Sequence, residues 1–337
     1  MAEIPLVIDA ASHHRPGGGY QNPWPDAAPA SRSGGFLRWR LVDRRNHPIA
    51  PNPPRDSLPR RTPSIVTPRA ECGYRSVTWV GHATALLQLG PVNLLTDPMW
   101  SERASPLQWL GPRRLMSPGL DFDALPPLDV VLLSHNHYDH LDARTVRRIA
   151  RRFPDTPWLC PLGVGELLRR FGVRHAVERD WWQTVDGATF SATCAPARHF
   201  SARGLRDRNE TLWCGWVIEA DGARVFFAGD TALHPAFAEI GARFAAFDLV
   251  MLPIGAYEPR WFMRRVHMNP EDAVAAYRML HNGAAAAPPC VAMHWGTFRL
   301  TDEPLDEPPT RFARCWTEAG LPGQANWTLV HGETRRW

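Results

Sequence analysis

Short apolar runs separated by turn residues dominate the chain from Arg75 onward. The first three, SVTWV, ALLQL and VNLL between residues 76 and 95, predict strands, with Gly90-Pro91 as a hairpin turn before the third. The run DVVLL at 129–133 is continuously apolar, which is typical of a strand buried on both faces. The pattern therefore predicts a β-rich core that begins near residue 71.

Two capping residues are followed by residue patterns typical of helices. After Asp142, a preferred N-cap, apolar residues recur at i, i+3, i+4 and i+7 before Pro154 ends the predicted helix, namely Val146, Ile149, Ala150 and Phe153. After Asn269, the sequence Pro-Glu-Asp fixes the first helical φ and places negative charge at the positive end of the helix dipole. A second helix is expected from there to Gly283.

Hairpin signals and strand ends continue to the carboxyl-terminal part. Asp186-Gly187 and Asp221-Gly222 lie between strand-like runs, and Asp-Gly is the strongest short signal for a β-hairpin. The run ARVFFAGD ends at Asp230, and a last strand, VAMH, ends at His294. The sequence contains no internal repeat or low-complexity tract, so we expect one domain of interleaved strands and helices at 71–337.

Residues 1–70 have a different composition. They hold 12 of the 33 prolines and the run Gly17-Gly18-Gly19, which exclude a mostly helical segment or a central strand. They also contain large apolar residues that an idle linker would not need, namely Trp24, Phe36, Leu37 and Trp39. We expect an extended arm packed on the core, and a flexible linker is the alternative.

Composition and charge exclude several classes of protein. With 337 residues, of which 44% are hydrophobic and 21% charged, the chain can bury a large core and is too apolar to be disordered. The 38 basic residues, all arginine, exceed the 34 acidic ones by only four. This excess is too small to predict a nucleic-acid partner.

The cysteine spacing and the amino-terminal residues are used to predict the cellular compartment of the protein. The six cysteines include no CxxC pair, so neither a disulfide framework nor a cysteine zinc site is predicted. Residues 1–14 lack a basic segment followed by an apolar one, and no stretch reaches the roughly 18 apolar residues of a membrane span. We expect a cytoplasmic protein, with a peripheral position at a membrane left open.

The sequence SHNHYDHLD at 134–142 places three imidazoles and a carboxylate within six positions, directly after a predicted strand. Residues two apart on extended backbone point the same way, so His135 and His137 are placed to bind one metal ion. The chain then turns toward the predicted helix, which lets Asp139 and His140 face a second ion.

Three further residues lie at the ends of predicted strands, where a scaffold presents side chains to a site: His199, Asp230 and His294. A single histidine is more often structural. Two ions that share a bridging ligand, however, need six or seven protein ligands, and these residues complete that number. Together the residues predict a two-metal centre.

This ligand pattern resembles the hallmark of the metallo-beta-lactamase superfamily. Further blocks are similar, in order, to the N-acylphosphatidylethanolamine-hydrolysing phospholipase D family and its bacterial relatives: NPWP, GHATALLQLGPVNLLTDPMW, GPRR, PARHFSARGL, GDTA, VHMNPEDAV and MHWGTF. The resemblance covers nearly the whole chain and thins over residues 40–70.

The resemblance implies an α/β (α+β) fold, a four-layer αββα sandwich with two zinc ions at one edge of the strands; manganese and iron are alternative metals. By position, His135, His137 and His199 would bind the first ion, Asp139, His140 and His294 the second, and Asp230 would bridge them. The implied reaction is phospholipase D-type hydrolysis of a lipid phosphodiester by a hydroxide that bridges the ions. Asp139 would orient this hydroxide and is the candidate general base.

Other residues are candidates for contact with the substrate or the ligands. His267 matches a histidine that the family places near the substrate, although it could serve only at the helix entry. Arg198 and Arg203 flank His199 and could bind a phosphate, and Trp295 could form a pocket wall. His82 and Asp97 could support the ligand imidazoles from outside or stabilise turns.

Several functions remain open at this stage. A lactonase or sugar-phosphate-lactone hydrolase uses nearly the same ligands, and a di-iron redox protein or a silent metal site on the same scaffold are further alternatives. The expected partner is a lipid or small-molecule phosphodiester, with transient membrane-surface contact or a homodimer possible.

Overall fold

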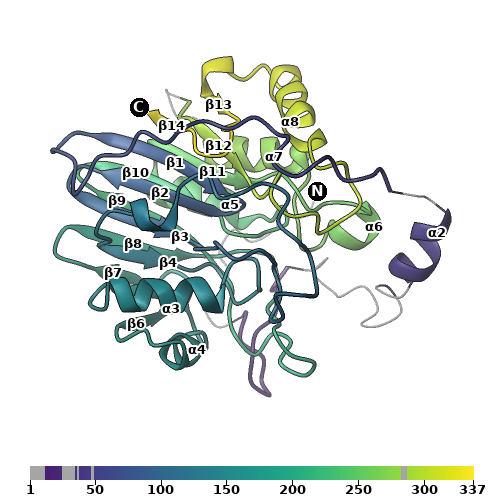
Figure 1. Cartoon of the computed structure of the whole chain (residues 1–337), viewed down its shortest axis with the longest axis horizontal. Helices are drawn as coiled ribbons and strands as arrows, with labels where there is room; N and C mark the ends of the chain where they lie inside the picture. The colour runs from purple at the N-terminus through teal and green to yellow at the C-terminus, as the bar shows by residue number, and fades with distance from the viewer. Residues whose placement is uncertain (1–11, 25–34, 36–37, 47–48, 282–286) are drawn as a thin grey trace.

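Two seven-stranded β-sheets pack face to face in the computed structural model, and helices cover their outer faces (Figure 1). The structure describes residues 12–24, 35, 38–46, 49–281 and 287–337. This is the four-layer αββα sandwich that the resemblance implied.

The first sheet has its strands in the order β14 (Thr334–Arg336), β1 (Arg75–Gly81), β2 (Thr84–Leu89), β3 (Val92–Thr96), β4 (Val130–Leu132), β5 (Trp158–Pro161) and β6 (Ala176–Arg179). Successive side chains alternate between two cores: Leu94 and Leu132 face the second sheet, whereas Leu95 and Val131 face the outer helices. Both faces are therefore apolar, which explains the continuous hydrophobic runs in the sequence.

The second sheet has the order β13 (Asn326–Trp327), β12 (Cys290–Met293), β11 (Leu249–Pro253), β10 (Ala223–Phe227), β9 (Gly215–Ala220), β8 (Phe190–Ala195) and β7 (Thr184–Asp186). Strands β10 to β13 pair in parallel, and β7 to β10 pair antiparallel. The core between the two sheets contains large aromatic side chains, including the fully buried Trp79 and Trp216.

Two groups of helices form the outer layers. On the first sheet lie α3 (Ala143–Arg152) and α4 (Gly165–Arg170), whose buried side chains include Val146, Ile149 and Leu168. On the second lie α5 (Ala236–Phe244), α7 (Pro270–Leu280) and α8 (Glu307–Glu318), and the short α6 (Arg260–Met263) precedes α7. Among the described residues, no helix is both long and apolar enough to cross a membrane.

The predicted caps and hairpins are confirmed. The Asp142 side chain accepts a hydrogen bond from the Arg144 amide at the start of α3, and Asn269 and Asp272 form a capping box at the start of α7. Both residues of the Asp221-Gly222 turn have positive φ, which the tight β9–β10 hairpin requires. The predicted end of α7 at Gly283 lies outside the described residues.

Described parts of residues 1–70 contact the core. Trp24 stacks on His234, with ring centroids 4.5 Å apart, and the Arg61 amide donates to the His331 carbonyl at 2.9 Å. The described part of this segment includes a short helical stretch, η2 (Trp39–Asp43) and α2 (Arg44–Asn46). Phe36 and Leu37 lie outside the described residues, so the domain boundary near 70 stays a prediction.

Candidate metal centre

The ends of six strands meet at one edge of the sandwich. Strands β1, β3 and β4 run in the same direction in the first sheet, as do β8, β10 and β12 in the second. The residues just after these strands are the predicted ligands and their predicted supports: His82, Asp97, the loop 134–140, His199, Asp230 and His294. The topology therefore gathers these side chains from segments far apart in the sequence.

Backbone strain marks the same edge. His82, Asp97 and His294 have φ values of 57°, 31° and 62°, in the left-handed region that residues other than glycine rarely adopt. Gly229 (φ 60°) allows close packing there, because a Cβ atom at this position would lie 2.5 Å from the Ser134 Cβ. Such strain is typical of functional sites, where surrounding contacts hold the backbone in place.

The first group of ligand atoms consists of three imidazoles. The Nδ1 atom of His137 lies 2.7 Å from His135 Nε2 and 3.2 Å from His199 Nε2. His135 and His199 are fully buried, whereas His137 is partly exposed. The three nitrogens converge on one point, as the resemblance implies for the first ion.

The second group lies beside the first and is joined to it by Asp230. The Oδ2 atom of Asp230 is 3.1 Å from His140 Nε2, 3.0 Å from His294 Nε2 and 3.8 Å from His199 Nε2. Asp139 Oδ2 lies 3.4 Å from His140 Nε2 and 3.5 Å from His294 Nε2. Asp230 thus reaches both groups, which is the position that a bridging carboxylate needs.

Further side chains orient these ligands from outside. Asp97 Oδ2 lies 2.6 Å from His140 Nδ1 and accepts a hydrogen bond from the Ser134 hydroxyl at 2.6 Å. His199 Nδ1 donates to the Val266 carbonyl at 2.7 Å, which leaves its Nε2 facing the centre. Because a hydrogen bond on one ring nitrogen fixes the tautomer, these contacts direct the other nitrogen's lone pair inward.

His82 supports Asp139. Its Nε2 lies 2.8 Å from Asp139 Oδ2, and its backbone amide donates to the Thr297 hydroxyl at 2.8 Å. Thr297 is in turn 2.9 Å from His331 Nε2. Asp97 thus lies against a ligand imidazole, as expected, whereas His82 Nε2 contacts the Asp139 carboxylate instead of an imidazole.

Charges within the centre balance each other. Burial disfavours the charged form of His140, but Asp230, Asp139 and Asp97 outweigh burial and raise its pKa well above 6.5, so a cation bound at Nε2 would displace a proton. Burial also disfavours the Asp230 carboxylate, yet His140 and His294 hold its pKa well below 3.8. Burial and the neighbouring His140 lower the pKa of His135 well below 6.5, so this imidazole is neutral and has a lone pair available to a metal.

The donor set fits a pair of metal ions. Imidazole nitrogens and carboxylate oxygens are the ligands that zinc and related ions prefer. Asp230 Oδ1 is buried and has no hydrogen-bond partner among the described residues, and the ion-pair contacts of His140 Nε2 and His294 Nε2 with Asp230 Oδ2 do not have hydrogen-bond geometry. Because unpaired buried polar atoms are costly, bound cations would explain why the fold retains them.

His267 lies over the centre. Its Nδ1 is 3.9 Å from Asp230 Oδ2, and its ring centroid is 5.0 Å from that of His199. Burial lowers the pKa of its imidazole to about 4, so it is neutral near pH 7. His267, His137 and Asp139 are partly exposed, so the centre opens to solvent on this side.

Both candidate arginines contact backbone carbonyl groups. Arg203 Nη1 donates to the carbonyls of Asn136 and Leu141 at 2.7 and 2.8 Å, and its guanidinium lies over the Tyr138 ring. Arg198 Nη1 lies 3.4 Å from the Leu233 carbonyl. The structure thus gives Arg203 a part in fixing the ligand loop, and phosphate contact by either arginine stays a prediction.

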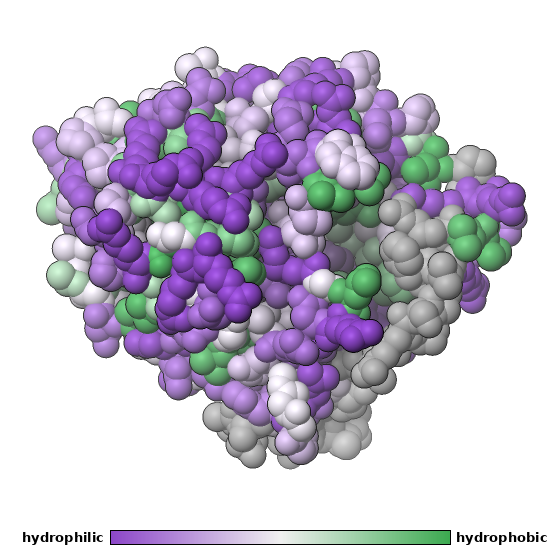
Figure 2. Space-filling model, turned by 60° about the horizontal axis from the view of Figure 1, so that its bottom comes forward, coloured by the Kyte–Doolittle hydropathy of each residue, from purple (hydrophilic) through white to green (hydrophobic). Residues whose placement is uncertain are grey.

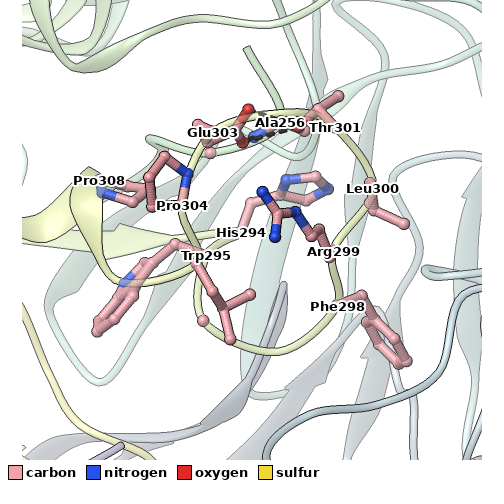
Figure 3. Close-up of a pocket in the computed structure, with 13 residues that line it drawn as sticks. Ala256, His294, Trp295, Phe298, Arg299, Leu300, Thr301, Glu303, Pro304 and Pro308 are labelled. Carbon is pink, nitrogen blue, oxygen red and sulfur yellow. Dashed lines mark hydrogen bonds between the residues drawn. The ribbon is translucent and has the colours of Figure 1, made fainter. Parts of the chain in front are cut away.

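Trp295, which directly follows His294, packs into the core. Its indole is 8% exposed and stacks on Trp79 with a centroid distance of 5.2 Å, and it points away from the His294 imidazole (Figure 3). The adjoining cavity has a volume of about 10 Å³, enough for a single water molecule. Glu303, which accepts hydrogen bonds from the Ala256 and Glu258 amides, is among the residues that line it. This cavity is too small to bind a lipid.

Several supporting residues were missed by the sequence analysis. Ser134 precedes the motif directly, and its hydroxyl could have been recognised as a possible partner of a ligand. Thr297, His331 and the Val266 carbonyl had no such signal, because only the tertiary structure brings them to the ligands.

Comparison with known proteins places the chain in a family. Residues 92–295 match the beta-lactamase superfamily domain. An uncharacterised protein of Mycobacterium tuberculosis is 43% identical over 280 residues, which are 82% of this chain and 72% of that protein. N-acyl-phosphatidylethanolamine-hydrolyzing phospholipase D 1 of Caenorhabditis elegans is 39% identical over 233 residues, 66% of this chain and 64% of that protein.

Solved structures show the same fold. Igni18, a metallo hydrolase from the archaeon Ignicoccus hospitalis, superposes with a TM-score of 0.57 at 22% identity and covers 78% of this chain and 98% of its own. The ligand motif, the sandwich and the matched domain agree. The chain therefore belongs to the metallo-beta-lactamase superfamily, and its sequence is similar to that of the N-acylphosphatidylethanolamine-hydrolysing phospholipases D.

Proposed function

We propose that this protein is a binuclear metal-dependent phosphodiesterase of the phospholipase D type that acts on N-acylphosphatidylethanolamine-like lipids. The observation that carries the proposal is the position of Asp230 Oδ2 between two groups of ligand atoms. The 39% identity to the nematode phospholipase supports the substrate class.

The residues that would hold the ions form two sets that share one carboxylate. His135, His137 and His199 form one set, Asp139, His140 and His294 form the other, and Asp230 would be shared. When bound, two divalent ions supply a reactive water-derived nucleophile near neutral pH and neutralise charge on a phosphodiester. Zinc suits this donor set best.

The chain's own residues would move the protons. Asp139 is partly exposed at the open side, and its pKa is held well below 3.8 because, despite burial, His140, His294 and His82 favour the carboxylate. Asp139 is therefore ionised near neutral pH and would orient an attacking water molecule, for which it is the candidate general base. His267, neutral and on the same open side, is placed to donate a hydrogen bond to a substrate oxygen.

Exposed apolar side chains support a lipid substrate. Figure 2 shows hydrophobic residues at the edge of a hollow in the face turned forward. Large exposed apolar residues occur in the loop after Asp97, beside Arg203 and before His267: Leu107, Trp109, Leu110, Leu205 and Trp261. Such side chains would allow transient contact with a membrane surface.

The test compares three substrates on the purified, zinc-loaded protein. N-acylphosphatidylethanolamine in mixed micelles, bis(p-nitrophenyl) phosphate and a simple lactone are assayed in parallel, with Asp230→Asn as the matched inactive control. We expect release of N-acylethanolamine and phosphatidic acid, slower cleavage of the soluble diester and no lactone opening. Preference for the lactone would overturn the proposal in favour of a lactonase.

A further inference from the structure

A second cluster of ligand-type side chains lies outside the centre. His13 Nε2 is 2.6 Å from one carboxylate oxygen of Asp180, and His14 Nε2 is 2.7 Å from the other. Two imidazoles from the amino-terminal arm thus converge on a carboxylate that is 167 and 166 residues away in the chain. None of these residues belongs to the centre described above.

The cluster is held in position before any ligand binds. His13 is 1% exposed and stacks on Trp181 with ring centroids 4.1 Å apart. The carboxylate of Asp180 accepts a hydrogen bond from the Trp181 amide at 2.8 Å, and the Asp180 amide donates to the Gln183 side chain at 3.0 Å. Two of the three side chains are therefore fixed by neighbours, which lowers the cost of ordering them around a ligand.

The third side chain leaves the cluster open to solvent. The His14 side chain is 40% exposed, and that of Asp180 is 19% exposed. The pKa of Asp180 is lowered despite its burial, because hydrogen bonds from His13 and His14 favour the ionised form. The cluster thus offers an anionic oxygen and two imidazole nitrogens on a surface that an ion and water molecules can reach.

We propose that His13, His14 and Asp180 form a separate binding site for one divalent transition-metal ion of the zinc class. Two imidazoles and one carboxylate, whose ligand atoms lie within 4.8 Å of one another, are a sufficient protein ligand set for zinc, with solvent completing the coordination. An entering ion replaces the hydrogen bonds between the rings and the carboxylate with bonds to all three side chains.

Such an ion would fasten the amino-terminal arm to the core. From His13 the described arm continues to Asn22, whose side chain donates to the His199 carbonyl at 2.8 Å, and to Trp24, which stacks on His234. The arm therefore joins the cluster to the backbone of a predicted ligand of the centre. The site would stabilise this contact without taking part in hydrolysis.

The experiment counts bound zinc in untagged, full-length protein, because a histidine tag would bind zinc itself. Protein depleted of metal is equilibrated with micromolar free zinc, desalted and analysed by elemental mass spectrometry. We expect His14→Ala and Asp180→Asn to bind about one zinc equivalent fewer than wild type, because each loses a ligand of this site. His175→Ala, which removes an exposed histidine outside the cluster, should bind as much as wild type.

A further variant separates this site from the centre. Asp230→Asn should lose zinc from the centre, and adding His14→Ala to it should remove a further equivalent. Limited proteolysis gives a second readout: zinc should slow cleavage within residues 12–24 of Asp230→Asn but not of the double variant. Equal zinc content in wild type, His14→Ala and Asp180→Asn would overturn the proposal.

Discussion

His82 Nε2 lies 2.8 Å from Asp139 Oδ2, so a fully buried imidazole directs the carboxylate that the proposed mechanism uses as a metal ligand and base. The imidazole is held in turn, since Thr297 accepts a hydrogen bond from the His82 amide and Trp79 Nε1 donates to the His82 carbonyl. Orientation of Asp139 thus depends on residues that never touch the open side of the centre.

Removing this support should reduce activity without unfolding the protein. We expect His82→Leu to lower metal affinity or turnover by roughly 10- to 100-fold, the usual effect of losing an outer partner of a ligand. His82→Gln, which can still donate a hydrogen bond to Asp139, should recover part of the loss. A zinc titration measures the metal affinity of each variant, and the bis(p-nitrophenyl) phosphate assay measures its turnover. Wild-type values for His82→Leu would contradict the role.

We expect Asp97 to strengthen zinc binding because it sets the tautomer of His140. Its Oδ2 lies 2.6 Å from His140 Nδ1, which holds a proton on Nδ1, so that Nε2 is the nitrogen that would bind a metal ion. In Asp97→Asn an amide group can face Nδ1 instead, so we expect zinc affinity to fall roughly 10- to 100-fold. Ser134→Ala, which removes one hydrogen bond to the same carboxylate, should have a smaller effect. A larger loss of zinc affinity in Ser134→Ala than in Asp97→Asn would show that Asp97 does not act through the tautomer of His140.

Acid should destabilise the fold through His234. This residue is 3% exposed, both ring nitrogens lack hydrogen-bond partners in the described structure, and burial together with Arg198 lowers its pKa to about 3. The unfolded chain, with an ordinary value near 6.5, binds more protons between pH 6.5 and 3, so stability falls as pH drops through this window. The loss is on the order of 3 kcal/mol by pH 4.

The variant His234→Phe separates this contribution from the rest of the protein. Phenylalanine can keep the stacking on Trp24 and Phe237 but cannot be protonated. Thermal unfolding between pH 7 and 4 should show a smaller decrease of melting temperature for the variant than for wild type. An equal decrease of melting temperature in wild type and variant would show that His234 does not contribute to the acid sensitivity of the fold.

Exposed apolar side chains should affect lipid turnover only. Trp109 is 74% exposed and Leu205 fully exposed, so replacing both with serine should weaken binding to phospholipid vesicles without disturbing the core. We expect hydrolysis of vesicle-bound substrate to decrease several-fold while cleavage of bis(p-nitrophenyl) phosphate is unchanged. Equal vesicle binding by wild type and variant in a sedimentation assay would argue against membrane contact through these residues.

The sequence predicts the strands of this fold well, because both faces of each central strand are buried and its apolar run is uninterrupted. It also identifies the candidate ligands that the fold brings together, since His135, His137, Asp139 and His140 share one short motif and the remaining candidates follow recognisable strands. The fold brings these segments together at one edge, which is why residues chosen by spacing lie within a few ångströms of Asp230.

Contacts between distant segments could not be predicted. The path from His331 through Thr297 to His82 joins residues up to 249 positions apart, and no local pattern encodes it. The carbonyl partners of Arg203 are a second example: its position beside a ligand suggested a phosphate contact, which stays a prediction, and gave no sign that Nη1 donates to the Asn136 and Leu141 carbonyls. Which groups an arginine meets depends on tertiary packing.

Anomalous scattering from crystals of the zinc-loaded protein tests the central claim most directly. The account predicts two zinc peaks at the strand edge, one bound by His135, His137 and His199 and the other by Asp139, His140 and His294, with Asp230 in contact with both. A single ion at this edge, or none within bonding distance of Asp230, would contradict a binuclear centre.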